Sequence, residues 1–264
     1  MKNYSDLTFT DDFLFCKILS TDKDLCKELL ELILGISIER IEVSEAQEAV
    51  DIKCDSKGIR LDIYAVDELG NIYDIEMQTT SKKDIPKRTR YYQGMIDMNL
   101  IRKGGKVKDL KKTYVIFICP FDPFKKGLPV YTFRNTCMED PSIFLGDEAE
   151  KVVINASGDR TNLSDDMRAF LEFIKNGTSS SELTGKLREA VDDAKEHKEW
   201  EVSYMTLFMK IQEEREEAAI DQMIETGLKY GASETSILED LMNKFHLSRE
   251  DALEKVHEFN LQPA

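Results

Sequence analysis

The chain has 264 residues, of which 41% are hydrophobic and 33% are charged, and its formal net charge is −15. This composition is typical of a soluble globular protein, and the negative charge argues against broad nonspecific binding to nucleic acid. The N-terminal segment lacks the features of a signal peptide, and the longest apolar run, Tyr114 to Pro120, is far shorter than the about 20 residues of a membrane helix. We therefore expect a cytoplasmic protein.

Cysteine and histidine are placed in a way that excludes several kinds of site. The five cysteines form no CxxC pair and are expected to be buried free thiols: Cys16, Cys26, Cys54, Cys119 and Cys137. The three histidines lie in the polar C-terminal part, which argues against zinc sites and histidine-assisted nucleophiles. The GxSxG, GxxxxGK[ST] and GxGxxG motifs are also missing. If the protein is an enzyme, carboxylates carry its chemistry.

The first half of the chain alternates between helical and strand patterns. Thr10 or Asp11 is expected to cap a helix over DDFLFCKILS, and Thr21 or Asp22 a second helix that Gly35 ends. Period-two alternation then predicts strands at 38–43, 49–54, 59–66 and 72–78. Next come a helix over 86–101, the strand YVIFICPF buried on both faces, and strands near 130–134 and 151–154. This order predicts a mixed sheet flanked by helices.

From Leu163 onward the pattern is helical. Ser164 is expected to cap one helix, Gly177-Thr-Ser-Ser-Ser is the best linker candidate, and one long acidic helical stretch covers roughly 182–229. Two short helices follow, capped near Ser233 and by Ser248-Arg-Glu-Asp251, with Phe245, Leu247, Val256 and Phe259 as their core. We predict an α/β domain over residues 1–160 and an all-helical extension over 161–264.

One segment of this acidic protein is strongly basic. Between Lys82 and Lys112 there are eleven Lys and Arg residues against three Asp, which gives a local charge of about 11 − 3 = +8. Such a segment is either a solvated surface or a face that meets phosphate groups.

The stretch GIRLDIYAVDELGNIYDIEMQ, residues 58–78, predicts a hairpin that carries acidic groups. The loop Glu68-Leu69-Gly70 suits a three-residue turn in which Gly70 adopts the left-handed conformation. This loop pairs Asp67 with Asn71 and therefore Asp62 with Glu76 and Arg60 with Gln78. Alternation places Asp74, Glu76 and Gln78 on one face of the second strand.

Directly opposed residues of such a pair have Cβ atoms about 5 Å apart, so the carboxylates of Asp62 and Glu76 are expected to repel each other. A divalent metal between them would remove the repulsion, because Mg²⁺ takes one or two carboxylates and completes its octahedron with water and phosphate. The alternative is a solvent-facing pair on an open sheet face, neutralised by Arg60. The hairpin alone does not decide between the two.

The wider pattern resembles the PD-(D/E)XK nucleases, and within them the recombination-promoting nuclease (Rpn) and transposase type. The resemblance covers most of the first 160 residues. Its pieces are DDFLFCKIL, RLDIYAVDELGNIYDIEMQ, the helix RTRYYQGMIDMNL with Arg88 and Tyr92, the loop at Lys103-Gly104-Gly105 and the strand YVIFICPF. The opening helix departs from the family's D-x-x-F-K-x-x-F pattern, because Lys17 stands one place late.

The resemblance implies a restriction-endonuclease-like core and metal-activated hydrolysis of DNA. Asp62 matches the family's first metal-binding Asp and Glu76 its second acid, and both would hold Mg²⁺ or Mn²⁺. Gln78 stands where most PD-(D/E)XK enzymes have Lys, although Gln is found there in this family. A neutral Gln can hydrogen-bond the attacking water but adds no positive charge, which puts the rate in doubt.

Further expectations concern the substrate and partners. Arg88 and Tyr92 share a helix face that is expected to point towards the site, and contacts to DNA are expected from Lys82, Lys83, Lys87, Arg88 and Tyr92. Asp12 and Glu28 could each add a metal ligand, but helix capping and exposure explain them more simply. Homodimerisation through the helical extension is expected. The rival interpretations are a catalytically idle member that binds DNA or protein, and an interaction protein that acts through its acidic helical half.

Overall fold

The computed structural model describes residues 2–44, 62–81, 84–101 and 106–261. Within them the chain forms two compact units, Met1–His197 and Lys198–Ala264. The strand expected at 49–54 lies outside the described residues. The domain boundary expected near residue 160 stays a prediction. No described helix is both long and apolar enough to cross a membrane.

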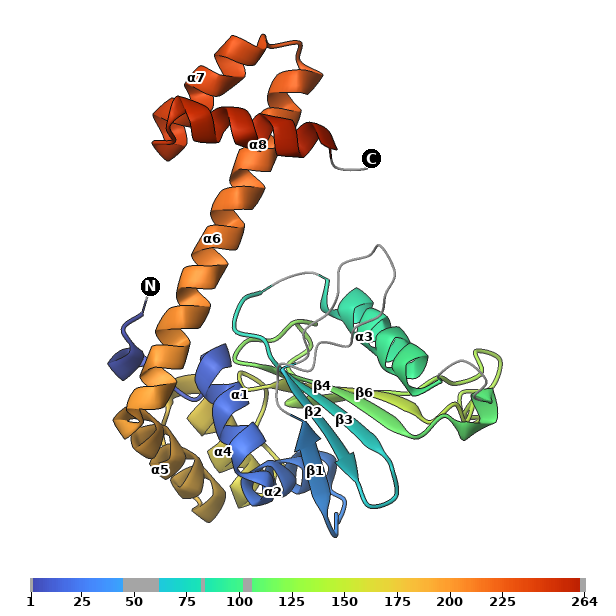
Figure 1. The fold of residues 1–264 in the computed structure, drawn as a ribbon. Helices are drawn as coiled ribbons and strands as arrows, with labels where there is room; N and C mark the ends of the chain where they lie inside the picture. The colour runs from blue at the N-terminus through green and yellow to red at the C-terminus, as the bar shows by residue number, and fades with distance from the viewer. Residues whose placement is uncertain (1, 45–61, 82–83, 102–105, 262–264) are drawn as a thin grey trace. The chain divides into compact units, whose positions relative to one another are not determined.

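The first unit is built on a mixed sheet with the strand order β1-β2-β3-β4-β6-β5 (Figure 1). Its strands are β1 Ile41–Ser44, β2 Ile63–Asp67, β3 Ile72–Met77, β4 Thr113–Cys119, β5 Val130–Phe133 and β6 Ala149–Asn155. β1, β2 and β3 are antiparallel neighbours, β3, β4 and β6 run parallel, and β5 is an antiparallel edge strand. The α/β class that the sequence predicts is therefore the observed one.

Helices cover both faces of this sheet (Figure 1). They are α1 Asp12–Thr21, α2 Lys23–Leu34, α3 Ile85–Leu100 and α4 Asp165–Asn176, and α5 Glu182–Glu196 packs on α1, α2 and α4. α3 packs one face through a cluster that includes Tyr92, Ile96, Phe117 and Val153. Every residue of β4 is buried, because helices lie on both of its sides. This agrees with the prediction of a strand buried on both faces.

The helix ends follow the local sequence. The Asp22 side chain accepts a hydrogen bond from the Leu25 N–H at 2.9 Å, and Gly35 ends α2 with a φ of 65°. Ser164 caps α4 in the same manner, since its hydroxyl accepts a bond from the Met167 N–H. These three caps confirm the helix limits predicted at these positions.

The acidic stretch 182–229 is helical as predicted, and it consists of two helices. α5 ends at Glu196, His197 is extended, and α6 begins at Lys198. In a continuous helix the Ala194 carbonyl would accept the N–H of residue 198. Here it accepts the Tyr4 hydroxyl at 2.6 Å and the His197 N–H at 3.1 Å. The helix therefore breaks at the point where the N-terminal segment is bonded to the last turn of α5.

The second unit comprises α6 Lys198–Lys229, α7 Glu234–Phe245 and α8 Arg249–Leu261. Ser233 caps α7, and Ser248 exchanges bonds with Asp251 at the start of α8, which confirms the predicted capping box. The small core includes buried Val256 together with partly buried Phe245, Leu247 and Phe259, as expected. A Cβ on Gly227 would lie 2.7 Å from Ile237, so glycine permits the close contact of α6 with α7.

Three of the cysteines, Cys16, Cys26 and Cys119, are buried free thiols as predicted. Cys137 is half-buried, and its thiol donates to the Glu139 carboxylate at 3.1 Å. The prediction was wrong for Cys137, because it lies in an exposed loop near β5. Cys54 lies outside the described residues.

The β2–β3 hairpin is held at its turn by one carboxylate. Gly70 has a φ of 83°, and the strands pair Tyr64 with Asp74 and Ile63 with Ile75, which confirms the predicted register. Asp67 accepts the N–H groups of Leu69 and Asn71 on one oxygen, and the Asn71 amide and the Tyr73 hydroxyl on the other. Burial alone would raise the pKa of Asp67, but these donors lower it.

We expect Asp67→Ala to reduce the free energy of unfolding by about 2–4 kcal/mol, because it leaves the buried Tyr73 hydroxyl and two backbone N–H groups unpaired. Urea denaturation followed by circular dichroism measures the loss. Leu69→Ala in the same turn is the control, since Leu69 is 69% exposed, and should change stability by less than about 0.5 kcal/mol. Equal effects of the two substitutions would contradict this role of Asp67.

Candidate active site

The hairpin brings Asp62 and Glu76 to facing positions, one residue before the first pair of β2 with β3. The Asp62 N–H donates to Oε1 of Glu76, and the Met77 N–H donates to Oδ2 of Asp62, both at 3.0 Å. Glu76 is only 3% exposed. The alternative of a solvent-facing acid pair is therefore wrong for Glu76. Arg60, which was to neutralise that pair, lies outside the described residues.

Asp74 is a third acid on the same face, and it is not among the site residues predicted from the sequence. Its side chain is fully buried, and neither carboxylate oxygen has a hydrogen-bond donor among the described residues. Burial, then the charges of Glu76 and Asp62, raise the pKa of Asp74 well above its ordinary value. The alternation of YDIEMQ places Asp74 on the same strand face as Glu76. This pattern could have identified Asp74 as a site residue from the sequence.

The same environment acts on Glu76. Burial and the nearby Asp62 charge raise the pKa of Glu76 to about 8, although the Asp62 N–H and the Arg88 charge oppose the shift. Three carboxyl groups thus share a buried region where an ionised carboxylate is costly. Such a region has a high affinity for positive charge.

Arg88 of α3 is a cation that reaches this region. Its Nη2 donates to Oε2 of Glu76 at 3.3 Å and to the Tyr92 hydroxyl at 2.8 Å, and its Nη1 donates to Oε1 of Gln78. Its guanidinium carbon lies 5.0 Å from the ring centre of Phe117 and 5.3 Å from that of Tyr92. The expectation that Arg88 points towards the acids agrees with this geometry.

Gln78 and Tyr92 have different surroundings from those that the sequence suggested. Gln78 is buried, and its amide nitrogen donates to the Thr80 carbonyl at 2.6 Å and to the Thr80 hydroxyl at 3.0 Å. Tyr92 is also buried, with its ring stacked on Phe117 at 5.9 Å between centroids. Tyr92 therefore supports Arg88 from within the core, and its contact with DNA stays a prediction.

The donor set suits a hard divalent cation. Asp62 and Glu76 offer carboxylate oxygens, and Asp74, which has no donor among the described residues, shows that Arg88 alone does not satisfy the acids of this region. Among the described residues, no three His, Cys, Asp or Glu side chains are already placed to hold a metal together. The arrangement thus fits an ion with two protein carboxylates that takes its other ligands from water and substrate, as Mg²⁺ does.

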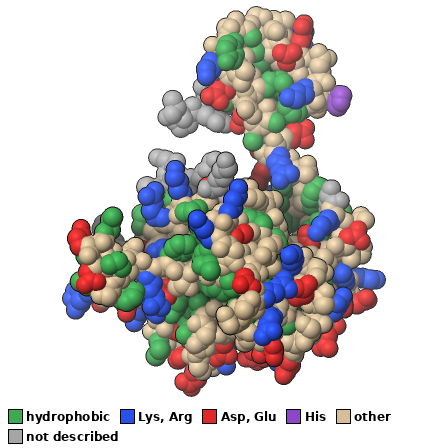
Figure 2. All heavy atoms as spheres, turned by 180° about the vertical axis from the view of Figure 1, so that it is seen from behind, with side chains coloured by type: hydrophobic (Ala, Val, Ile, Leu, Met, Phe, Trp, Pro, Cys, Tyr) green, Lys and Arg blue, Asp and Glu red, His purple; other side chains and the backbone are tan. Residues whose placement is uncertain are grey.

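The basic segment 82–112 is not one surface. Arg88 is turned towards Glu76, whereas Lys112 precedes β4 at the opposite end of the strands and pairs with Glu150 at 2.9 Å. Lys87 is exposed, and Lys82 and Lys83 lie outside the described residues. Figure 2 shows acidic side chains along the lower edge of the α/β unit in that view, and Lys and Arg side chains along its upper edge. Contacts of Lys82, Lys83 and Lys87 with DNA stay predictions.

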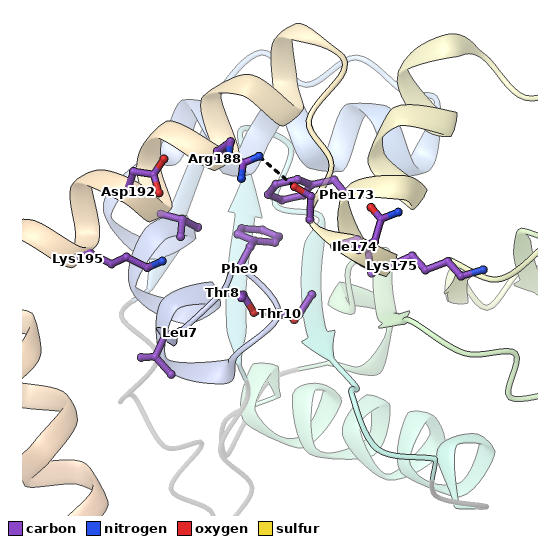
Figure 3. Close-up of a pocket in the computed structure, with 13 residues that line it drawn as sticks. Leu7, Thr8, Phe9, Thr10, Phe173, Ile174, Lys175, Arg188, Asp192 and Lys195 are labelled. Carbon is purple, nitrogen blue, oxygen red and sulfur yellow. Dashed lines mark hydrogen bonds between the residues drawn. The ribbon is translucent and has the colours of Figure 1, made fainter. Parts of the chain in front are cut away.

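Two surface hollows lie apart from these acids. One, of about 260 Å³, is bounded by the segment before α1 and by α4 and α5, with Phe9, Phe173 and Arg188 among its lining residues (Figure 3). The other, of about 370 Å³, lies beside α3 and is lined by Arg90 and Phe133, among others. Neither is lined by Asp62, Asp74, Glu76 or Gln78. The candidate active site is therefore identified by its carboxyl groups, and not by the presence of a large cavity.

A pH dependence of stability follows from the raised pKa of Glu76. The unfolded carboxyl group ionises near 4.5, whereas the folded one keeps its proton up to about 8, so the folded state binds more protons between these values. The metal-free protein should therefore lose stability, on the order of several kcal/mol, as the pH rises from about 4.5 to 8. Thermal unfolding in EDTA measures this. The decline should become shallower in Glu76→Gln, where the raised pKa of Asp74 still contributes, and should persist in Asp109→Asn, an exposed control; an unchanged decline in Glu76→Gln would refute the assignment.

Comparison with known families gives a match that agrees with this geometry. The family model described as PD-(D/E)XK nuclease family transposase matches residues 9–140, which is half of the chain. These residues include the β2–β3 hairpin and the Arg88 helix. No curated protein and no solved structure matches the chain significantly. The facing acids, the mixed sheet and this match lead to one conclusion: the chain belongs to the PD-(D/E)XK nuclease family of the transposase type.

Proposed function

We propose that this protein is a Mg²⁺-dependent endonuclease that hydrolyses phosphodiester bonds of DNA, and that it serves recombination or mobile elements. The observation that carries the proposal is the facing pair of half-buried Asp62 and buried Glu76, joined by backbone hydrogen bonds beside a guanidinium. Family membership supports nuclease chemistry in general. DNA as the substrate, the endonucleolytic mode and the metal are our proposal.

Asp62 and Glu76 would hold Mg²⁺, or Mn²⁺ in its place. When bound, such an ion lowers the pKa of water and stabilises charge on the phosphoryl group. The protein's own contribution is to fix both carboxylates by backbone N–H donors, so that the pair keeps one geometry. Arg88 is in contact with Glu76 and is placed to meet an anionic phosphate oxygen.

The reaction divides its tasks among few groups. Gln78 is a neutral amide and cannot accept a proton from the attacking water, so proton removal must involve solvent or a carboxylate. Asp74 has no donor among the described residues, and burial raises its pKa, so in the free site it keeps its proton and adds no charge. A divalent ion beside the pair would favour the ionised acids and would offset their repulsion of an anionic phosphate, which couples substrate binding to the metal.

A catalytically idle, DNA- or protein-binding member is the second candidate, and the neutral Gln78 is the observation in its favour. The expected dimerisation through the helical extension also stays a proposal. Exposed apolar side chains on α6, Val202, Met205 and Met209, support it. A cytoplasmic location stays a prediction from composition.

Plasmid nicking tests the reaction class directly. In Mg²⁺ or Mn²⁺, Asp62→Ala and Glu76→Ala should each reduce nicking by about two to three orders of magnitude, because each removes a ligand for the ion that stabilises the transition state. EDTA should abolish nicking. Asp109→Ala is the matched acid control and should leave nicking unchanged. Nicking that survives in both site variants would overturn the proposal, and metal binding without any nicking would favour the idle member.

Metal binding has its own readout in thermal stability. At pH 8, millimolar Mn²⁺ should raise the melting temperature, because the ion replaces the missing positive charge among the three acids and binds only the folded state. The rise should be smaller at pH 6, where Glu76 keeps its proton. Asp62→Ala should lose most of the rise. Equal shifts at both pH values in wild type and Asp62→Ala would show that the ion binds elsewhere.

A further inference from the structure

The side chain of Gln78 has both ends of its amide occupied. The amide nitrogen is held by the carbonyl and hydroxyl of Thr80, at 2.6 and 3.0 Å. This leaves the amide oxygen in a fixed orientation, and Nη1 of Arg88 donates to it. Both N–H donors of the amide are in use, so Gln78 can donate no hydrogen bond to a water molecule without releasing Thr80, and only the second lone pair of its oxygen stays open.

Arg88 is in turn held on several sides. It donates to Gln78, Glu76 and Tyr92, and these three bonds leave two of the five guanidinium N–H donors without a partner among the described residues. Its side chain is 25% exposed, so the guanidinium borders solvent while its other edge faces Glu76. A phosphate oxygen arriving from solvent would meet a charge that is already oriented.

The charges around the site explain why such a cation is needed. Asp62, Asp74 and Glu76 are three acids in mutual interaction, and a phosphodiester is itself an anion. A lysine at position 78 would place its ammonium beside the Arg88 guanidinium, and the two like charges would repel each other in a buried setting. A glutamine avoids this repulsion and adds an acceptor that orients the guanidinium.

We propose that Gln78 is a positioning residue that acts through Arg88, and that Arg88 supplies the positive charge that meets the scissile phosphate. Thr80 fixes the amide, the amide fixes the guanidinium, and Tyr92 with Phe117 supports it from the core. This inference rests on the proposed nuclease function and assigns the source of positive charge within that same site. It replaces the expectation that Gln78 contacts the attacking water.

A double-mutant cycle on plasmid nicking separates the two roles. Gln78→Ala should lower kcat/KM by about tenfold and Arg88→Gln by about a hundredfold, in line with the loss of one oriented donor at a developing charge. If Gln78 acts only through Arg88, then Gln78→Ala should have no further effect in the Arg88→Gln background. The same tenfold loss in both backgrounds would overturn the proposal, because Gln78 would then act independently of Arg88.

Two further variants make the result specific to charge and position. Gln78→Lys combined with Arg88→Gln should recover at least about tenfold of the activity that Arg88→Gln loses, because it returns a positive charge to the site. No recovery in a folded double variant would count against the charge role. Arg90→Gln, an exposed arginine on the same helix, is the matched control, and its effect should combine additively with Gln78→Ala. Melting temperatures of all variants establish that they are folded, and Arg88→Met, which also removes the charge, serves if Arg88→Gln does not fold.

DNA affinity gives a readout that does not depend on cleavage. Fluorescence anisotropy with a labelled duplex, with Ca²⁺ in place of Mg²⁺, should show about tenfold weaker binding for Arg88→Gln and no further weakening when Gln78→Ala is added. If wild type does not nick but this coupling is present, the positioning role stands and the endonuclease proposal falls. If wild type nicks and the coupling is absent from both measurements, the endonuclease proposal stands and the positioning role falls. A wild type that neither nicks nor binds the duplex would overturn both.

Discussion

The structure of the site depends on the contact between Arg88 and the acids that β3 carries beneath α3. Glu76 and Asp74 are buried, and carboxylates in such a place are costly unless a positive group compensates them. Arg88 reaches Glu76, whereas Asp74 has no donor among the described residues. Arg88 therefore compensates only part of the free-energy cost of burying these carboxylates. This remaining deficit accompanies two properties of the site, the raised pKa of Glu76 and the position of α3 across the sheet, and it is the physical basis of the proposed metal binding.

The hairpin and its register could be predicted because each signal was local. Gly70 fixed the turn, and period-two alternation then determined which residue opposes which, so that the pairing of Asp62 with Glu76 followed by counting. The caps at Asp22, Ser164, Ser233 and Ser248 are local signals of the same kind. The fold class followed from the order of such elements and from the family resemblance.

Other features depend on contacts between distant parts of the chain, and such contacts could not be predicted from local sequence patterns. Next to the break at His197, the Ala194 carbonyl accepts a hydrogen bond from Tyr4, nearly two hundred residues earlier. The basic segment 82–112 looked like one patch, but its ends approach opposite ends of the strands, where Arg88 and Lys112 find buried acids. The proposed role of Gln78 depends on contacts that are nearer in the chain, to Thr80 and to Arg88 of α3, but these follow from how the side chains pack and not from strand alternation. Asp74 differs from these, because alternation predicted its position on the face of the strand. Only its complete burial could not be predicted.

The topology of the sheet has a consequence for how the chain is synthesised and folded. β6 lies between β4 and β5, although it comes last in sequence and starts beyond residue 140, where the family match ends. As the chain leaves the ribosome, β4 therefore keeps one edge open and β5 has no partner until residue 155 has emerged. An open edge of the apolar strand β4 is prone to pair with other chains. Early helix formation by α3 does not cover that edge, so nascent chains that stall before β6 should depend most on chaperones, and the family-matched segment alone is a poor choice for expression.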